Sequence, residues 1–200
     1  NPNYHYFLGV TAIRQRNYDE AIASREQATK LAPTNSDYFA ELGNAYGSAA
    51  RTAGMFAQVS LAKKCRLALE KAVELNPDSL DARNGLISFY RQAPGFLGGG
   101  MDKAYLQAEE IRKRDFRRGS LILAQLHAAE KRFPDAFGTI LELLQREPDL
   151  YVAHYTMGRL AADSGQRLDA GEKHLRRCLE LTPAPREPGH AAVHFQLGQI

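Results

Sequence analysis

The chain has 200 residues, of which 44% are hydrophobic, enough to form a folded core. Its 26 Lys and Arg against 23 Asp and Glu give a net charge of +3, so overall charge neither requires nor excludes an anionic partner. Cys65 and Cys178 lie far apart, which excludes a disulfide framework and a paired zinc motif. No apolar run reaches the about 18 residues of a membrane span, and the first residues do not resemble a signal peptide. Since a signal can be removed from a mature chain, the compartment stays open between cytoplasmic and periplasmic or secreted.

The first 35 residues predict a hairpin of two helices. Residues from about 3 to 15 have apolar side chains at helical spacing, and Asn17 can cap a second helix while Glu20 reaches back to it. The second helix must end before Pro33, because the residue before a proline is pushed out of the helical region. Gly9 and Ala21 place small side chains where the two helices approach, which permits a short distance between their axes.

The same spacing returns in the second half of the chain. Small or apolar residues and a closing proline recur at the same distances from two leucines. After Leu8 these residues are Gly9, Ala21, Ala28 and Pro33. After Leu123, at the same distances, they are Ala124, Ala136, Leu143 and Pro148. A period in the thirties with this composition is typical of stacked helical hairpins.

The second unit of this pattern carries an insertion. It opens at Leu42 and closes at Pro77, a span ten residues longer than the one from Leu8 to Pro33. The extra residues lie near positions 54–61. Their composition predicts a second helix that starts early and is unusually long.

The third unit contains the least regular piece of the chain. It begins with a cap at Asp78 or Ser79, and its second helix should begin near Met101. Between its helices lie residues 93–100, a glycine-rich turn. Its Phe96-Leu97 pair either tucks against the helices or protrudes toward a partner.

The fourth unit, about 117–148, returns to the regular spacing and places Pro134 in the first turn of its second helix, where the missing N–H costs least. The fifth unit ends at Pro183. A sixth opens near Leu197 without a second helix. Because a terminal helix of such an array lacks one neighbour, it should expose an apolar face near Val193 and Leu197, which would pack on a missing repeat or another subunit.

The spacing resembles that of the tetratricopeptide repeat family over nearly the whole chain, although His5 and Ser120 stand where an aromatic residue is often found. The resemblance implies an all-α fold, a right-handed superhelical solenoid of antiparallel helix pairs with about 11 helices. It predicts a single array over residues 1–200. The repeats would cover about 2–35, 36–78, 79–116, 117–150 and 151–184, with an incomplete sixth at 189–200.

Members of this family commonly bind an extended peptide or a partner helix on a concave surface lined by the first helix of each pair. The resemblance therefore implies a non-enzymatic protein–protein interaction scaffold with no cofactor, whose protein or peptide ligand the sequence does not identify.

The side chains expected on the concave surface lie on the faces that the Leu-Gly packing pairs leave free. They are Tyr6, Val10, Asn44, Asn84, Ser88, Arg91, Gln125, Tyr155 and Arg159, and Ala40, Gly47 and Leu121 share these faces. Amides can pair with peptide N–H and C=O groups, and arginine can hold a carboxylate. The alternative is that these residues simply form the solvated face of each helix.

The stretch from Arg112 to Arg118 places five basic residues around Phe116, a pattern that can meet nucleic-acid phosphates. It supports an alternative function as a nucleic-acid-associated adaptor. The stretch also falls at a predicted helix end, where the helix dipole favours positive charge. No nucleic-acid-binding motif accompanies it, so nucleic acid is the less favoured partner.

Phosphate and metal sites are weaker hypotheses. Gly100 is followed by Met101 and Asp102, whereas a phosphate loop needs lysine and a hydroxyl at that point. His174 and Cys178 are four residues apart, and so are His190 and His194. Neither pair has a third metal ligand at a spacing typical of a metal site. We therefore assign no catalytic or metal-binding residue, and expect both cysteines to be small buried apolar residues.

Overall fold

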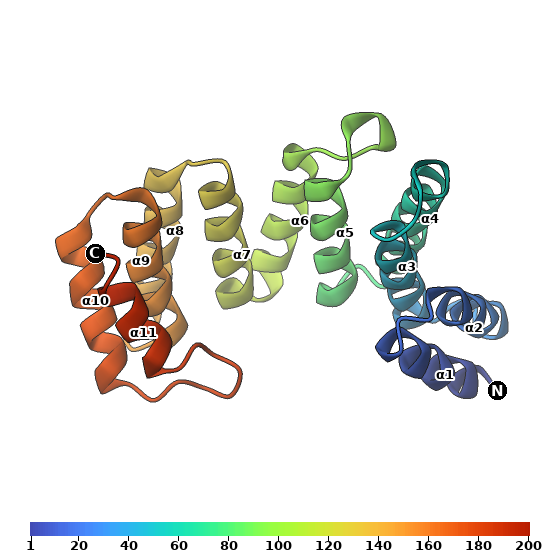
Figure 1. Ribbon diagram of the computed structural model, residues 1–200, viewed down its shortest axis with the longest axis horizontal. Coiled ribbons are helices and arrows are strands. Elements are labelled where there is room, and N and C mark those ends of the chain that lie inside the picture. The colour runs from blue at the N-terminus through green and yellow to red at the C-terminus, as the bar shows by residue number, and fades with distance from the viewer. The chain divides into compact units, whose positions relative to one another are not determined.

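The computed structural model describes all 200 residues. The protein is all-α, with eleven α-helices, one short 3-10 helix and no strand (Figure 1). The all-α prediction and the number of helices are therefore confirmed. None of the helices combines the length and apolarity that crossing a membrane requires. The chain divides into two compact units, Asn1–Ile111 and Arg112–Ile200, which we call unit 1 and unit 2.

Unit 1 consists of consecutive helices that pack on their neighbours in the chain. The helices are α1 (Pro2–Arg14), α2 (Tyr18–Leu31), α3 (Ser36–Ala50), α4 (Met55–Leu75), α5 (Leu80–Gln92), the 3-10 helix η1 (Gly95–Leu97) and α6 (Met101–Arg114), whose last turn passes the boundary.

The expected caps begin the helices of unit 1. The Asn17 side chain accepts a hydrogen bond from the Glu20 N–H at 3.3 Å, and its amide donates to the Glu20 carboxylate at 2.8 Å. Ser79, one of the two expected caps, accepts from the N–H of Ala82. Each cap satisfies an N–H group that the first helical turn leaves unpaired.

Helix α4 is 21 residues long, which confirms that the inserted residues extend a helix and do not form a loop. Its Leu69 packs between two neighbouring helices. A Cβ atom added to Gly43 of α3 or to Gly85 of α5 would lie 2.6 Å from a Leu69 side-chain atom. Glycine at both positions therefore lets the three helices approach.

Unit 2 consists of α7 (Phe116–Ala129), α8 (Phe133–Arg146), α9 (Tyr151–Ser164), α10 (Leu168–Glu180) and α11 (His190–Leu197). Pro134 lies in the first turn of α8, as expected. Phe137, Ile140 and Leu143 of α8 are almost fully buried and form one core with α9. Gly158 packs so tightly that a Cβ there would lie 2.2 Å from the Leu175 side chain of α10.

The prediction for the last helix is wrong. Val193 is fully buried, because α11 folds back on α9 and α10 and packs with Tyr151, Leu175 and Cys178. Leu197 is partly buried in the same cluster. The exposed apolar side chain of α11 is Phe195, with 64% of its surface accessible. The helix thus covers the end of the α9–α10 hairpin itself.

Candidate functional site

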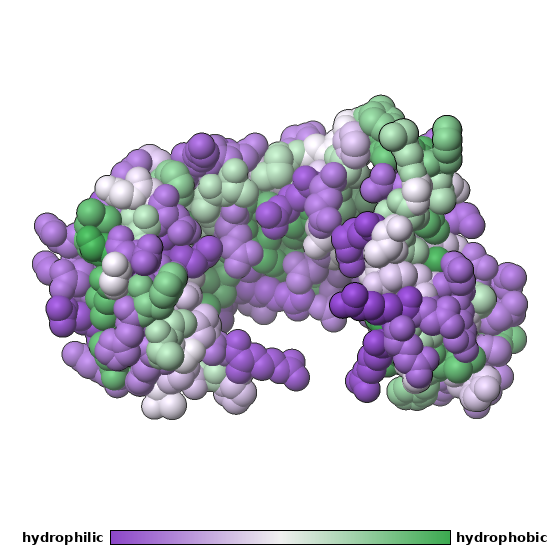
Figure 2. All heavy atoms as spheres, viewed as in Figure 1, coloured by the Kyte–Doolittle hydropathy of each residue, from purple (hydrophilic) through white to green (hydrophobic).

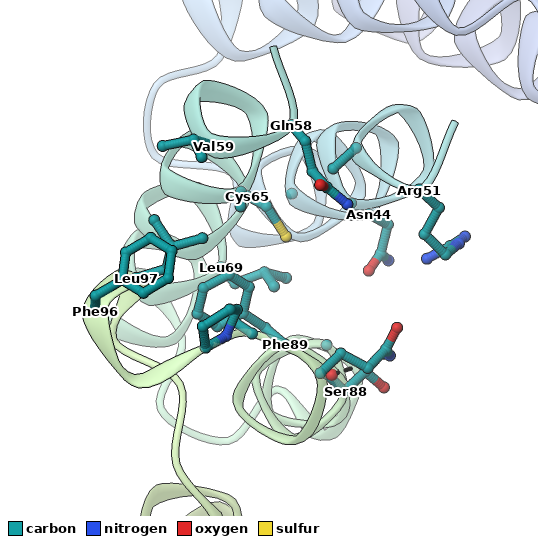
Figure 3. A pocket seen from close by; sticks show the side chains of 18 of the residues that line it. Asn44, Arg51, Gln58, Val59, Cys65, Leu69, Ser88, Phe89, Phe96 and Leu97 are labelled. Carbon is teal, nitrogen blue, oxygen red and sulfur yellow. Dashed lines mark hydrogen bonds between the residues drawn. The ribbon is translucent and has the colours of Figure 1, made fainter. Parts of the chain in front are cut away.

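A cavity of about 420 Å³ opens to solvent within unit 1, between α3, α4, α5 and the turn that follows α5 (Figure 3). Its walls are largely apolar and its rim is polar. The lining residues that we use below are Asn44, Gly47, Arg51, Met55, Gln58, Val59, Cys65, Leu69, Ser88, Phe89, Gln92, Phe96 and Leu97.

The insertion in α4 builds one wall of the cavity. Met55, Gln58 and Val59 lie in its first two turns, in the stretch where this unit exceeds the regular spacing. The opposite wall comes from α5, through Ser88 and Phe89. Gly47 of α3, which shares the expected concave face, also lines the cavity, and a Cβ there would lie 3.2 Å from the Cys65 sulfur. The departure from the repeat is thus what creates the space.

The turn after α5 closes one side of the cavity and has a defined conformation. Gly98 has φ of 93°, in the left-handed region that favours glycine. A Cβ on Gly99 would lie 1.7 Å from the carbonyl oxygen of Ala93, so only glycine fits. Leu97 is buried, whereas Phe96 is 79% exposed. The Phe96-Leu97 pair therefore does both things that the sequence allowed: one side chain tucks in and the other protrudes.

The backbone of the same turn does not favour the phosphate hypothesis. The N–H groups of Gly98, Gly99 and Gly100 donate to the carbonyls of Gly95, Pro94 and Tyr90 at 2.8, 3.2 and 2.9 Å. A phosphate loop needs such N–H groups to point at the anion. These three stabilise the turn.

The cavity rim contains two residues of the expected concave surface. Asn44 and Ser88 are both exposed and line the opening. Arg51, Gln58 and Gln92 join them, and Figure 3 shows Asn44, Arg51 and Ser88 on the open side. Sequence reasoning missed Arg51, Gln58 and Gln92, because it considered only first helices at regular spacing. The insertion before Cys65 was the signal that could have found Gln58.

Cys65, in the wall of the cavity, is buried, and burial raises its pKa to about 11. Cys178 of unit 2 is also buried, and burial raises its pKa to about 12. Both thiols are therefore protonated at neutral pH, and Cys178 donates a weak hydrogen bond to the Tyr151 carbonyl at 3.6 Å. The thiolate is the reactive form of cysteine, so both residues act as small apolar side chains.

The other expected residues of unit 1 do not line the cavity. Asn84 is half-buried and Arg91 is exposed, both on α5. On α1, Val10 is half-buried, and the ring of Tyr6 lies 5.7 Å from the Arg25 guanidinium. The structure therefore brings Asn44 and Ser88 together at one opening and leaves these four elsewhere.

One residue named with this set is buried. Ala40 has 4% of its surface accessible and packs with Ala72 and Ala82. It therefore belongs to the core between α3, α4 and α5, where three small side chains pack together. The expectation that it faces a ligand is wrong.

The three expected residues of unit 2 have separate environments. Gln125 is exposed on α7. Tyr155 is half-buried against the cluster around Leu175. Arg159 forms an ion pair with Asp163 at 3.7 Å on its own helix. The two residues stand four apart on one helix, a spacing at which side chains of opposite charge meet.

Two arginines of the basic stretch from Arg112 to Arg118 pair with carboxylates. Arg112 pairs with Glu142, and Arg117 pairs with Glu147. The Arg112 guanidinium also lies 4.7 Å from the centre of the Phe116 ring, and Lys113, Arg114 and Arg118 take part in further interactions. These contacts do not support the nucleic-acid alternative, since phosphate binding requires available positive charge.

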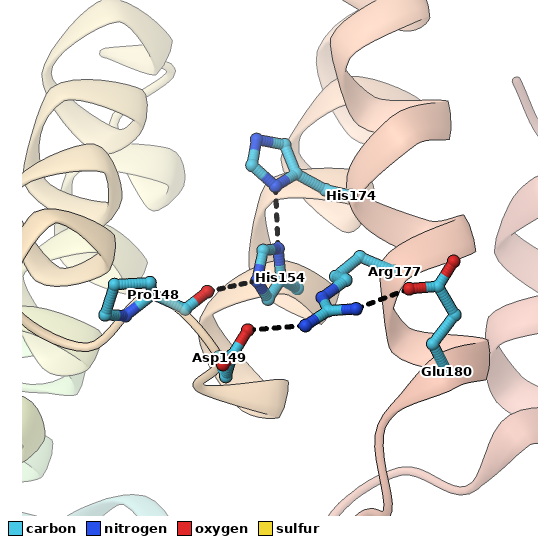
Figure 4. Close-up of polar contacts among 6 residues, drawn as sticks. All are labelled: Pro148, Asp149, His154, His174, Arg177 and Glu180. Carbon is cyan, nitrogen blue, oxygen red and sulfur yellow. Dashed lines mark hydrogen bonds and ion pairs between the residues drawn. The ribbon is translucent and has the colours of Figure 1, made fainter.

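A polar cluster links α9 and α10 (Figure 4). His154 and His174 face each other through their Nδ1 atoms at 2.8 Å, and Nε2 of His154 lies 2.8 Å from the Pro148 carbonyl oxygen. Burial and the neighbouring His154 lower the pKa of His174. Arg177 bridges Asp149 at 2.7 Å and Glu180 at 2.5 Å. No group of three His, Cys, Asp or Glu side chains is arranged to hold a metal ion.

Residues 2–35, which form α1 and α2, match the family model described as tetratricopeptide repeat. That match and the solved structures below decide the fold. The protein has the tetratricopeptide repeat fold. No curated protein matches the sequence.

Solved structures of tetratricopeptide repeat proteins resemble nearly all of the chain. PilF of Pseudomonas aeruginosa matches with a TM-score of 0.64 and 13% identity, over 92% of this chain and 77% of PilF. PilW, a type IV pilus biogenesis factor, matches with a TM-score of 0.61 and 18% identity, over 99% and 86% of the two chains. MamA of Desulfovibrio magneticus matches with a TM-score of 0.60 and 11% identity, over 90% and 94%. Such low identities establish a common fold and leave function open.

Proposed function

We propose that the protein is a non-enzymatic interaction scaffold that binds a peptide or a partner helix, with the cavity of unit 1 as its principal contact. The tetratricopeptide repeat fold of the chain supports a role in protein binding. The single observation that carries the proposal is the cavity itself, an apolar space that opens to solvent through a polar rim.

The contacts expected in this site follow from its chemistry. An apolar side chain of the partner would move out of water into the space between Val59, Phe89 and Leu97. This burial would favour binding by about 25 cal/mol per Å² of apolar surface removed from water. The amides of Asn44 and Gln58 would pair with N–H and C=O groups of the partner backbone, whatever its sequence. The site therefore suits a short protein segment with one apolar anchor.

The remaining expected residues extend this proposal. Asn84 and Arg91 continue the face of α5 on which Ser88 lies, since they stand four and three residues from it. Tyr6 and Val10 of α1 would add contacts in unit 1, and Gln125, Tyr155 and Arg159 would add contacts in unit 2. Their part in a concave binding surface stays a prediction.

A matched pair of serine substitutions tests the proposal. Ser88→Trp fills the opening of the cavity, whereas Ser60→Trp adds the same bulk to an exposed position of α4 that does not line it. Both variants and the unchanged protein would serve as bait for proteins from the native source, with captured partners quantified by mass spectrometry. We expect partners that the Ser60→Trp protein retains and the Ser88→Trp protein loses. Identical partners on all three baits would contradict the proposal.

A further inference from the structure

The walls of the cavity come from two segments that contain no acidic residue. Between Glu41 and Glu70 the chain has only basic charged residues, namely Arg51, Lys63, Lys64 and Arg66. Between Asp81 and Asp102 the charged residues are again basic, Arg83 and Arg91. Every lining residue of the cavity falls in one of these two segments. The one charged side chain that lines the cavity is Arg51, so the lining has a positive charge and no acid.

The positive charge at the rim itself has no carboxylate partner. Arg51 is exposed, and its guanidinium donates a hydrogen bond to the Ser48 hydroxyl at 3.1 Å. Arg66, in contrast, pairs with Glu70 at 3.3 Å. Arg83 donates to the Gln107 side chain at 2.6 Å, and Glu110 lies 3.8 Å away. Among the arginines of these two segments, Arg51 combines a place on the rim with a guanidinium that no carboxylate holds.

Large apolar side chains flank the same opening. Met55 at the start of α4 is 77% exposed, and Phe96 in the turn after α5 is 79% exposed. Phe56, next to Met55, is 93% exposed. Figure 2 shows hydrophobic residues gathered over the tip of α4 and this turn. Apolar side chains that remain in water at such a site are typical of an interaction surface.

We propose that the cavity binds an acidic protein segment, in which an apolar side chain enters between Val59 and Leu97 and a neighbouring Asp or Glu carboxylate pairs with Arg51. This inference rests on the proposed function and specifies the chemistry of the partner. The apolar lining favours an apolar side chain of the partner. Because the walls contain no acidic residue, charge complementarity favours a negatively charged segment. The planar guanidinium of Arg51 can hold a carboxylate with two hydrogen bonds. Basic segments are disfavoured because their positive charge meets Arg51 at the rim.

A random peptide library displayed on phage provides an unbiased probe. It would be selected against the unchanged protein, Arg51→Glu and Ser88→Trp. We expect peptides enriched on the unchanged protein to contain an aromatic residue or leucine together with more Asp and Glu than the unselected library. Arg51→Glu should lose this acidic excess while apolar residues remain enriched. Ser88→Trp should lose the enriched peptides altogether.

The outcomes separate the two proposals. Enriched peptides that Ser88→Trp loses, but that carry no acidic excess, would overturn the acidic partner and leave the scaffold function standing. The same acidic excess on Arg51→Glu would likewise overturn the role of Arg51. If no peptide is enriched in a way that depends on the open cavity, both proposals are overturned.

Affinities of one selected peptide sharpen the test. We expect Arg51→Gln to weaken binding by about threefold to tenfold, and the effect to shrink when salt screens the charges. The same peptide with its acidic residue changed to Asn or Gln should bind both proteins equally. Fluorescence anisotropy measures all four combinations, and additive effects of the two changes would contradict a direct pair.

Other occupants of this surface are distinguishable in the same series. Co-sedimentation with vesicles of phosphatidylserine and phosphatidylcholine that is lost in both Phe56→Ser and Arg51→Glu would assign the surface to a membrane and overturn the proposal. Dimerisation in analytical ultracentrifugation that Ser88→Trp abolishes would assign it to a second copy of the chain, with the same consequence. We expect neither.

Discussion

The two units use the same helical hairpin in different ways. In unit 2, Gly158 packs against Leu175, and the basic residues Arg112 and Arg177 are held by carboxylates of neighbouring segments. In unit 1 the insertion in α4 leaves a cavity, and Arg51 on its rim pairs with no acid. Glycines allow close packing in both units, whereas the two differ in their arginines: Arg112 and Arg177 are paired with carboxylates, and Arg51 is not.

The largest difference is expected between two glycines at corresponding places. Gly158→Ala should lower the free energy of unfolding by about 2–3 kcal/mol, because the added Cβ would lie 2.2 Å from the fully buried Leu175 side chain. Gly43→Ala should cost clearly less, because Leu69 borders the cavity and can shift into it. Urea denaturation measures both values. Equal losses would mean that the cavity does not relax as its geometry suggests.

Val193 tests whether α11 stabilises unit 2. Val193→Ala removes two buried methyl groups and should lower the free energy of unfolding by about 1.5–2 kcal/mol. Phe195→Ser, on the exposed side of the same helix, should change it by less than about 0.5 kcal/mol. Thermal unfolding of the two variants provides the measurement. A negligible effect of Val193→Ala would show that α11 does not depend on packing against α9 and α10.

Arg112 and Arg51 compare a paired with an unpaired arginine. Arg112→Gln should cost about 1 kcal/mol, since the side chain is largely buried, pairs with Glu142 and stacks on Phe116. Arg51→Gln should leave stability unchanged within about 0.5 kcal/mol and affect binding alone. A loss of stability in Arg51→Gln would indicate a structural role and argue against its availability to a ligand.

The smallest effect is expected from pH, at His174. Its pKa is lowered in the folded protein, so below about pH 6.5, the ordinary pKa of histidine, the unfolded chain binds a proton that the folded chain resists. Its contribution to stability is therefore complete above that pH and falls as the pH decreases through the folded pKa. His174→Gln should remove this part of the pH dependence, measured as the difference between the two denaturation profiles from pH 7.5 to 5. Parallel profiles would contradict the lowered pKa.

Much of the candidate site was beyond local sequence patterns. Asn44 and Ser88 could be placed on the faces of their helices, because helical periodicity fixes which side a residue occupies. Ala40 could not be assigned correctly, since its burial depends on Ala72 and Ala82 from other helices. Arg51 and Gln92 were missed for the opposite reason: they join the rim only because the long α4 and the turn after α5 enclose a space there.

The sequence by itself determined the helices, their caps and the hairpin pattern, because these depend on residues close together in the chain. It also showed that the insertion near residues 54–61 extends a helix. Only the tertiary structure decided that this extension encloses a cavity, that α11 buries Val193, and that Glu142 and Glu147 pair with Arg112 and Arg117 of the basic stretch. These outcomes depend on contacts between residues distant in sequence, where burial and pairing in space outweigh local preference.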